Sequence, residues 1–190
     1  MPRPTARLLI AAVLAATLPG AAACAVGPER ATPVGAVAPA PPASASPAVP
    51  VVPARVPETL SFTAKTLDGA AFSAATLAGR PVVLWFWAPW CATCASQAWT
   101  VAEIAPKYRD TVPIVGVAGL GEQKAMKEFV SEFELAGTPQ LDDRSGVLWR
   151  RFEVVEQSTF VVVDRDGRVV HQGFLDGEPL TRQVDALARG

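Results

Sequence analysis

The sequence predicts an α/β domain with a central mixed β-sheet, helices on both faces of the sheet and an N-terminal β-hairpin extension. The first observation is an apolar and aromatic run at residues 82–87, which is long enough for a buried strand and too short for a helix. The second is the alternation of strand-like and helix-like segments after this run, followed by a second hairpin and a last helix. The third is size, because 190 residues, 50% of them hydrophobic, can bury one substantial core.

The elements of this domain are expected from residue 58 onward. Two short strands at residues 60–64 and 70–72, joined by a turn at Asp68 and Gly69, form the first hairpin. The remaining elements, in chain order, are a helical turn at 73–78, the strand at 82–87, a helix at 95–108, a strand at 112–118, a helix at 122–135, a short strand at 141–142, a helix at 146–152, hairpin strands at 159–163 and 168–174, and a helix at 179–188. The helix at 122–135 carries an apolar stripe of Ala125, Met126, Phe129, Val130 and Phe133, which we expect to be its buried face.

The N-terminal segment has the organisation of an export signal. Arg3 and Arg7 precede an apolar stretch at residues 8–18, and small residues stand directly before Cys24. This pattern predicts a signal peptide at residues 1–23, since the stretch is too short for a permanent membrane-spanning helix. The cleavage region also resembles a bacterial lipobox, in which Cys24 would be lipidated, although Ala21 stands where that motif usually has leucine. Ordinary cleavage after the alanines is the alternative.

Residues 24–57 differ in composition from the rest of the chain. They are nearly all Ala, Pro, Val, Gly and Ser, they hold half of the 18 prolines and they contain no aromatic residue. Such a segment cannot bury enough apolar surface to offset the entropy of ordering it, so we expect a disordered tether. The globular domain then spans residues 58–190. We expect an extracytoplasmic protein of the cell envelope, lipid-anchored if Cys24 is modified and otherwise secreted.

Cys91 and Cys94 carry the chemistry that the sequence predicts. They stand where the apolar strand ends, after Pro89, and where a helix begins. At this spacing in the first turn of a helix the two Cα atoms lie roughly 5 to 6 Å apart, which a disulfide tolerates. The free N–H groups and the positive end of the helix dipole favour a thiolate at the first sulfur. We therefore expect Cys91 to be an exposed attacking sulfur and Cys94 to be a shielded resolving sulfur.

The run Trp-Ala-Pro-Trp-Cys-Ala-Thr-Cys after a buried strand, together with the order of elements, resembles the thioredoxin superfamily. The lead-in Phe-Thr-Ala-Lys-Thr-Leu-Asp-Gly and the stretch Val-Gly-Val-Ala-Gly-Leu are similar to its extracytoplasmic TlpA/ResA-type branch, and most similar to the DsbE/DsbF-like proteins of actinobacteria. The resemblance covers about residues 59–188. It implies a thioredoxin-like fold, thiol-disulfide exchange with protein thiols and no bound cofactor. It also implies that Cys91 is the nucleophile, that Cys94 resolves, and that Trp87 and Trp90 are the flanking indoles.

The chain departs from the family in the loop that faces the disulfide. The family usually has a cis-proline there, and the matching residue is Ser158. A cis bond before a residue other than proline costs about 2.5–4 kcal/mol, so either the bond is trans or the fold bears strain. We expect Ser158 and Thr159 to offer backbone groups to an incoming peptide, with Pro89 and the exposed Trp90 forming an apolar rim beside it.

Two further departures concern protons and helix shape. Trp85 stands where thioredoxins have a buried Asp, and Gln97 where relatives in this branch often have a Glu, so neither usual carboxylate is present. Less repulsion on the Cys91 thiolate stabilises the reduced form, which makes the disulfide a better oxidant. We therefore favour oxidation of exported protein thiols, with reduction of apocytochrome thiols through a membrane electron donor as the alternative. At Trp99 the family commonly has a kinking proline, so we expect a straighter helix.

The same residues allow other functions, each with weaker support in the sequence. A structural disulfide in a tethered, non-enzymatic binding module is the main alternative, but a three-residue loop gives little stabilisation. A metal site would need more ligands than His171, the one histidine, which we expect at the surface. A peroxidase would need an arginine to match Thr93. Trp85 and Trp99 are expected in the core, and Glu103 with Lys107 as a solvated helix pair.

Charge limits the partners. The formal net charge is −1 and the isoelectric point is about 5.9, which gives no basic surface for nucleic acid or anionic lipid. We expect a monomer that meets exported protein thiols or disulfides and a membrane redox partner. We predict no metal.

Overall fold

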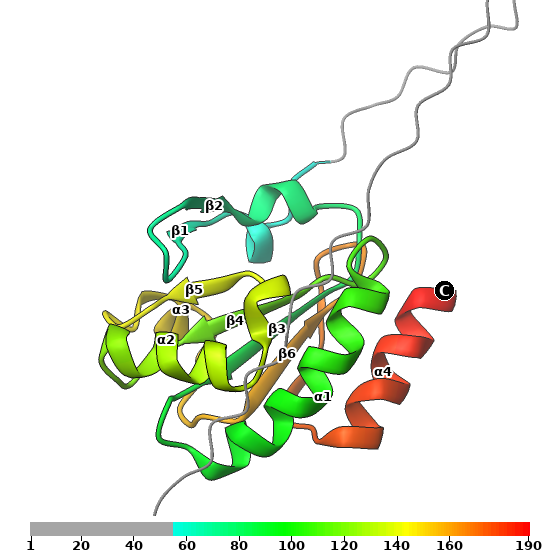
Figure 1. Ribbon diagram of the computed structural model, residues 1–190. Coiled ribbons are helices and arrows are strands. Elements are labelled where there is room, and N and C mark those ends of the chain that lie inside the picture. The colour runs from blue at the N-terminus through cyan, green and yellow to red at the C-terminus, as the bar shows by residue number, and fades with distance from the viewer. Residues whose placement is uncertain (1–54) are drawn as a thin grey trace, which may run out of the picture. The chain divides into compact units, whose positions relative to one another are not determined.

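The computed structural model describes residues 55–190 (Figure 1). The predicted signal peptide, Cys24 and the tether up to residue 54 lie outside the described residues. Within the described part of the chain, no helix combines the length and the apolar character needed to cross a membrane.

A five-stranded mixed sheet forms the centre of the domain, in the order β5-β4-β3-β6-β7. β3 pairs in parallel with β4, and β4 with β5, whereas β6 runs antiparallel to both β3 and β7. The strands are β3 (Val82–Trp87), β4 (Ile114–Ala118), β5 (Gln140–Asp142), β6 (Thr159–Val163) and β7 (Val169–Phe174). The predicted mixed sheet is therefore confirmed, with strand ends that differ from the expected ones by two residues or fewer.

β3 is central because every one of its residues is apolar and both of its faces are covered. Its side chains alternate between two cores. Val83, Trp85 and Trp87 pack into one core with the helices α1 (Ala92–Tyr108), α2 (Gln123–Glu132) and α4 (Gly177–Arg189). Leu84 and Phe86 pack into the other with α3 (Val147–Arg151) and the turns η1 (Glu58–Leu60) and η2 (Ala74–Leu77). Figure 1 shows α1 and α4 side by side on one face.

The N-terminal hairpin is a separate two-stranded sheet of β1 (Thr63–Lys65) and β2 (Ala71–Ser73). One antiparallel bridge, between Thr66 and Leu141, links it to β5. The first strand begins later than expected because residues 58–60 form a turn of 3₁₀ helix. The hairpin extension is confirmed.

Two helices differ from their predicted bounds by three residues at one end, more than α3 and α4 do. α1 begins three residues earlier than expected, with Cys91 as its N-cap, and continues through Pro106 near its end. α2 ends at Glu132 because Glu134 adopts a left-handed backbone, with φ of 56°, before the 3₁₀ turn η3 (Leu135–Gly137). The apolar stripe of α2 buries Met126, Phe129 and Phe133 as predicted.

Glu103 and Lys107 form the solvent-exposed ion pair on α1 that the sequence predicts. Lys107 Nζ lies 2.8 Å from Glu103 Oε1, and this hydrogen bond lowers the pKa of the Glu103 carboxyl. His171 lies half-buried on β7 rather than freely exposed, and its Nε2 contacts no hydrogen-bond partner among residues 55–190.

Candidate active site

Cys91 and Cys94 form a disulfide at the junction of β3 and α1, as the sequence predicts. Their Cα atoms are 5.2 Å apart. Cys91 keeps an extended backbone, with φ of −89° and ψ of 111°, and it caps the helix. Its Sγ accepts a hydrogen bond from the Cys94 N–H at 3.0 Å, which is one of the donors that a helix start leaves unpaired. The first sulfur therefore has the N–H contact that favours a thiolate.

The sulfurs are less accessible than expected. Cys91 is 6% exposed and Cys94 is completely buried. The prediction of an exposed Cys91 was wrong, because the motif does not indicate that the loop at Ser158 folds over both sulfurs. The predicted order of exposure is confirmed, since Cys91 is more exposed than Cys94.

Ser158 lies directly against the disulfide. Its Oγ is 3.2 Å from Cys91 Sγ and 3.2 Å from Cys94 Sγ. The residue is 7% exposed, and its φ of 66° places it in the left-handed region that serine rarely adopts. No cis peptide bond occurs among residues 55–190, so of the two expected alternatives the structure has the trans bond. Proline cannot adopt this backbone because its ring holds φ near −65°.

Gln97 hydrogen-bonds the backbone of Ser158, the residue that contacts both sulfurs, and links it to β3 and to Leu175. Its side chain is completely buried and all three of its hydrogen bonds reach distant segments. Its Oε1 accepts from Trp85 Nε1 at 2.9 Å, and its Nε2 donates to the carbonyl oxygens of Ser158 at 3.1 Å and of Leu175 at 2.7 Å. A neutral amide suits this place because it both accepts and donates, which a carboxylate cannot do. The sequence indicates at Gln97 only the absence of a carboxylate, and no local pattern predicts this network.

Stacked aromatic rings lie beneath the site. Trp85 stacks on Trp87 with ring centroids 5.8 Å apart and on Phe160 at 6.1 Å, and Trp87 stacks on Phe129 at 4.5 Å. Trp87 Nε1 donates to Gln140 Oε1 at 3.0 Å. The indole N–H groups of Trp85 and Trp87 thus both have partners, and their rings form an aromatic floor in the same core as the cysteines. Core packing of Trp85 is confirmed.

Pro89 and Trp90 form the rim of the site with the loop after β4. Trp90 is 61% exposed, as predicted, and its Nε1 donates to the Leu120 carbonyl oxygen at 2.6 Å. A side chain at Gly121 would meet the Pro89 ring at 2.6 Å, so the two loops approach closely there. Leu120 is 53% exposed beside Trp90. No sequence pattern indicates Leu120, because this contact joins residues 30 positions apart.

Two other predicted residues have different surroundings from those expected. Trp99 is 60% exposed on α1, with its ring at 5.1 Å from that of Phe133, so its assignment to the core was wrong. The Phe133 ring, just after the end of α2, meets the Trp99 ring edge to face and leaves most of Trp99 exposed. Thr159 is 6% exposed and its hydroxyl donates to the Glu156 carbonyl oxygen. It begins β6 next to Ser158.

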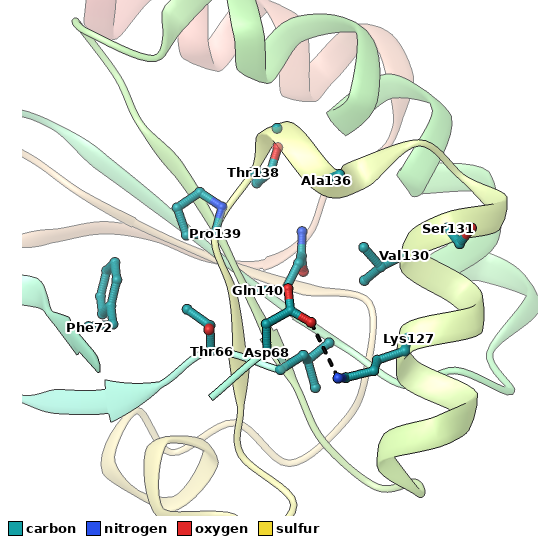
Figure 2. Close-up of a pocket in the computed structure, with 12 residues that line it drawn as sticks. Thr66, Asp68, Phe72, Lys127, Val130, Ser131, Ala136, Thr138, Pro139 and Gln140 are labelled. Atoms are coloured by element: carbon teal, nitrogen blue, oxygen red, sulfur yellow. Dashed lines mark ion pairs between the residues drawn. The ribbon is translucent and has the colours of Figure 1, made fainter. Parts of the chain in front are cut away.

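A pocket of about 570 Å³ lies elsewhere, between the first hairpin, α2 and the start of β5 (Figure 2). Figure 2 shows Lys127 of α2 directed toward Asp68 of the hairpin turn, and the two form an ion pair at 3.3 Å. Neither cysteine lines this pocket. Within the part of the chain that the structure describes, no three His, Cys, Asp or Glu residues gather as a metal site would require.

The arrangement of the cysteines suits reversible disulfide exchange. Cys91 keeps a small exposed fraction and its Sγ receives an N–H hydrogen bond, Cys94 is completely buried, and the groups that hydrogen-bond to the two sulfurs are uncharged. These are the properties of an attacking and a resolving cysteine.

The chain is similar to several bacterial proteins. The soluble secreted antigen MPT53 of Mycobacterium tuberculosis is 44% identical over 110 residues, which are 58% of this chain and 62% of that protein. The match thus spans less than two thirds of the relative's length. ResA of Bacillus cereus, named a thiol-disulfide oxidoreductase, is 27% identical over 129 residues, 67% of this chain and 73% of that protein.

Solved structures are similar over about two thirds of the chain. The structure of MTB DsbF in its mixed oxidised and reduced forms is 44% identical, with a TM-score of 0.65, and the match covers 70% of this chain and 99% of that one. A secreted disulfide oxidoreductase of Mycobacterium tuberculosis, described as homologous to E. coli DsbE, is 38% identical, with a TM-score of 0.63 and coverage of 68% and 98%. The model of the AhpC/TSA family matches residues 55–172. The chain therefore belongs to the AhpC/TSA family and, within its thioredoxin-like members, to the TlpA/ResA-type, DsbE/DsbF-like branch.

Proposed function

We propose that this protein is an extracytoplasmic thiol-disulfide oxidoreductase that exchanges disulfides with exported proteins. The observation that carries the proposal is the Cys91–Cys94 disulfide at the start of α1, with a hydrogen bond from the Cys94 N–H to Cys91 Sγ. Its relatives include a secreted antigen and proteins named as disulfide oxidoreductases. The signal-like segment at residues 1–23 supports the same compartment.

In this mechanism Cys91 is the sulfur that meets the client protein. A client thiolate attacks Cys91 Sγ, forms a mixed disulfide and releases Cys94 as a thiolate. The reverse sequence reduces a client disulfide. No cofactor enters either direction, because the cysteine pair itself carries the two electrons. Trp90 and Leu120 provide exposed apolar surface beside Cys91 for unfolded or extended client segments.

The activity is tested by insulin reduction and by oxidative refolding of a reduced, unfolded protein. We expect the full-length protein to accelerate both reactions above the rate in buffer with dithiothreitol or glutathione alone. Wild-type protein that is folded and disulfide-bonded yet accelerates neither reaction would assign the disulfide a purely structural role in a tethered binding module.

We further propose that the pair acts mainly as an oxidant. The hydrogen-bonding groups that contact the sulfurs within residues 55–190 are an N–H and a hydroxyl, and the buried Gln97 is uncharged. A thiolate in such surroundings meets no fixed negative charge in contact, and this stabilises the reduced form. Stabilising the reduced form makes the disulfide more oxidising.

Equilibration with glutathione tests the direction. We expect a reduction potential clearly less negative than that of thioredoxin, roughly −270 mV. Quantifying the reduced fraction by thiol alkylation and mass spectrometry gives the potential directly. A value at or below that of thioredoxin would contradict the oxidising role and support the alternative, a reductant kept reduced by a membrane electron donor.

Attachment at the membrane completes the proposal. Cys24 follows small residues at the end of the signal-like segment, and lipidation there would hold the domain at the outer face of the cell membrane through residues 25–57. A Cys24→Ala variant that moves from the membrane fraction to the medium would support the anchor. Wild-type protein found only in the medium would contradict it.

A further inference from the structure

The Ser158 hydroxyl stands between the two sulfurs of the disulfide. Its Oγ lies 3.2 Å from Cys91 Sγ and 3.2 Å from Cys94 Sγ. A disulfide sulfur carries no hydrogen, so the hydroxyl is the only possible donor in both contacts. One O–H group is thus placed where a small rotation directs it to either sulfur.

The protein holds this hydroxyl in place by its backbone. Ser158 adopts a φ of 66°, a conformation that costs energy for serine and persists only where the surroundings enforce it. The surroundings here include the buried Gln97, whose Nε2 donates to the Ser158 carbonyl oxygen at 3.1 Å and whose Oε1 is held by Trp85. Gln97 is therefore a positioning residue, while Ser158 itself touches the reacting atoms.

Each sulfur needs a donor at a different moment. Cys94 is completely buried, and among residues 55–190 its Sγ has one hydrogen-bonding contact, the Ser158 hydroxyl. A buried thiolate without a donor is strongly disfavoured, whereas a hydrogen bond to a charged group is about twice as strong as a neutral one. Cys91 Sγ has the Cys94 N–H in addition to the hydroxyl.

We propose that the Ser158 hydroxyl is a catalytic hydrogen-bond donor that serves first the Cys94 thiolate and then the Cys91 thiolate during one exchange cycle. This inference rests on the proposed exchange function. A client thiolate attacks Cys91 Sγ, the client–Cys91 bond forms, and the disulfide breaks with its electron pair on Cys94 Sγ, which accepts the hydroxyl hydrogen bond.

The second step returns the donor to the first sulfur. Another client thiolate attacks the client sulfur of the mixed disulfide, the client disulfide forms and Cys91 leaves as a thiolate. The client loses two electrons and the cysteine pair gains them. Cys94 takes a proton from solvent, and the hydroxyl turns to Cys91. The Ser158 proton stays on its oxygen throughout.

Two substitutions of Ser158 distinguish the effect of the hydroxyl from the effect of the left-handed backbone. Ser158→Gly removes the hydroxyl and accepts the left-handed backbone without strain, whereas Ser158→Ala removes it and keeps a Cβ. Glu134→Gly is the matched control, because Glu134 also has a positive φ, 56°, and makes no hydrogen bond to either cysteine within residues 55–190. Iodoacetamide alkylation of the reduced full-length proteins across pH, read by fragment-resolved mass spectrometry, reports the Cys91 thiol separately from Cys94 and Cys24.

We expect both Ser158 variants to raise the pKa of the Cys91 thiol by about one unit or more, the loss of one charge-assisted hydrogen bond. We also expect the equilibrium with glutathione to shift about tenfold toward the disulfide, or about 30 mV. Glu134→Gly should change neither value. A folded Ser158→Gly variant with the wild-type thiol pKa and the wild-type glutathione equilibrium would overturn the proposal. Because alkylation needs no client, this result is independent of whether wild-type protein accelerates insulin reduction.

Discussion

Replacing Cys91 with serine is expected to abolish disulfide exchange, with a loss on the order of 10³-fold or more, the scale seen when the nucleophile of a covalent mechanism is removed. The reason is access: Cys94 is completely buried, so once Cys91 is gone no reachable sulfur remains in the pair. Insulin reduction and refolding of a reduced substrate, measured with Cys91→Ser and wild-type protein side by side, check this result.

The matched control is Cys94→Ser, which keeps the reachable sulfur and removes the resolving one. This variant should accumulate mixed disulfides through Cys91, and mass spectrometry of the adducts identifies the clients. If Cys91→Ser retains wild-type activity, or if the adducts of Cys94→Ser form on Cys24 instead, the assignment of Cys91 as the attacking sulfur is wrong.

Replacing Gly116 with alanine is expected to destabilise the domain by about 2–5 kcal/mol, because overpacking and a broken buried hydrogen bond act together. A Cβ on Gly116 would lie 1.8 Å from Gln140 Oε1 and 2.9 Å from Trp87 Nε1. These are the two atoms of the hydrogen bond that joins the aromatic floor to β5. The free energy of unfolding, from urea titration followed by tryptophan fluorescence, measures the effect.

Gly137→Ala is the control for this substitution. Gly137 has no atom within 4 Å of an added Cβ, and it is not among the glycines with positive φ. We expect its unfolding free energy to stay within about 0.5 kcal/mol of wild type. Equal stability of the two variants would show that the close approach at Gly116 carries no energetic weight.

The parts of the fold that local pattern determines could be predicted from the sequence. The buried strand, the break at Pro89 and the helix after it place Cys91 and Cys94 at a strand-to-helix junction without any knowledge of distant residues. The mixed sheet follows from the order of the elements. The error at the end of α2 arises because Glu134 adopts a left-handed backbone that no pattern indicates.

The surroundings of the sulfurs could not be predicted in the same way. Gln97 Nε2 donates hydrogen bonds to carbonyl oxygens that lie 61 and 78 positions further along the chain, so its role depends on the tertiary structure. The same holds for the cover over Cys91, which comes from Ser158 at a separation of 67 residues. Trp99 was expected in the core, but the one aromatic ring that meets it within residues 55–190, Phe133, covers it only edge to face, which the sequence does not indicate.

The hydrogen bond between Gln97 and Leu175 joins residues 78 positions apart, and this separation matters during biosynthesis. A partly synthesised chain that ends before Ser158 already contains β3, α1 and both cysteines, but it lacks the groups that enclose the sulfurs. Contacts of such separation form late because the intervening chain must first be ordered. The two thiols of a nascent chain therefore lack the Ser158 hydroxyl and the cover over the sulfurs until β6 and the segment after β7 have been made.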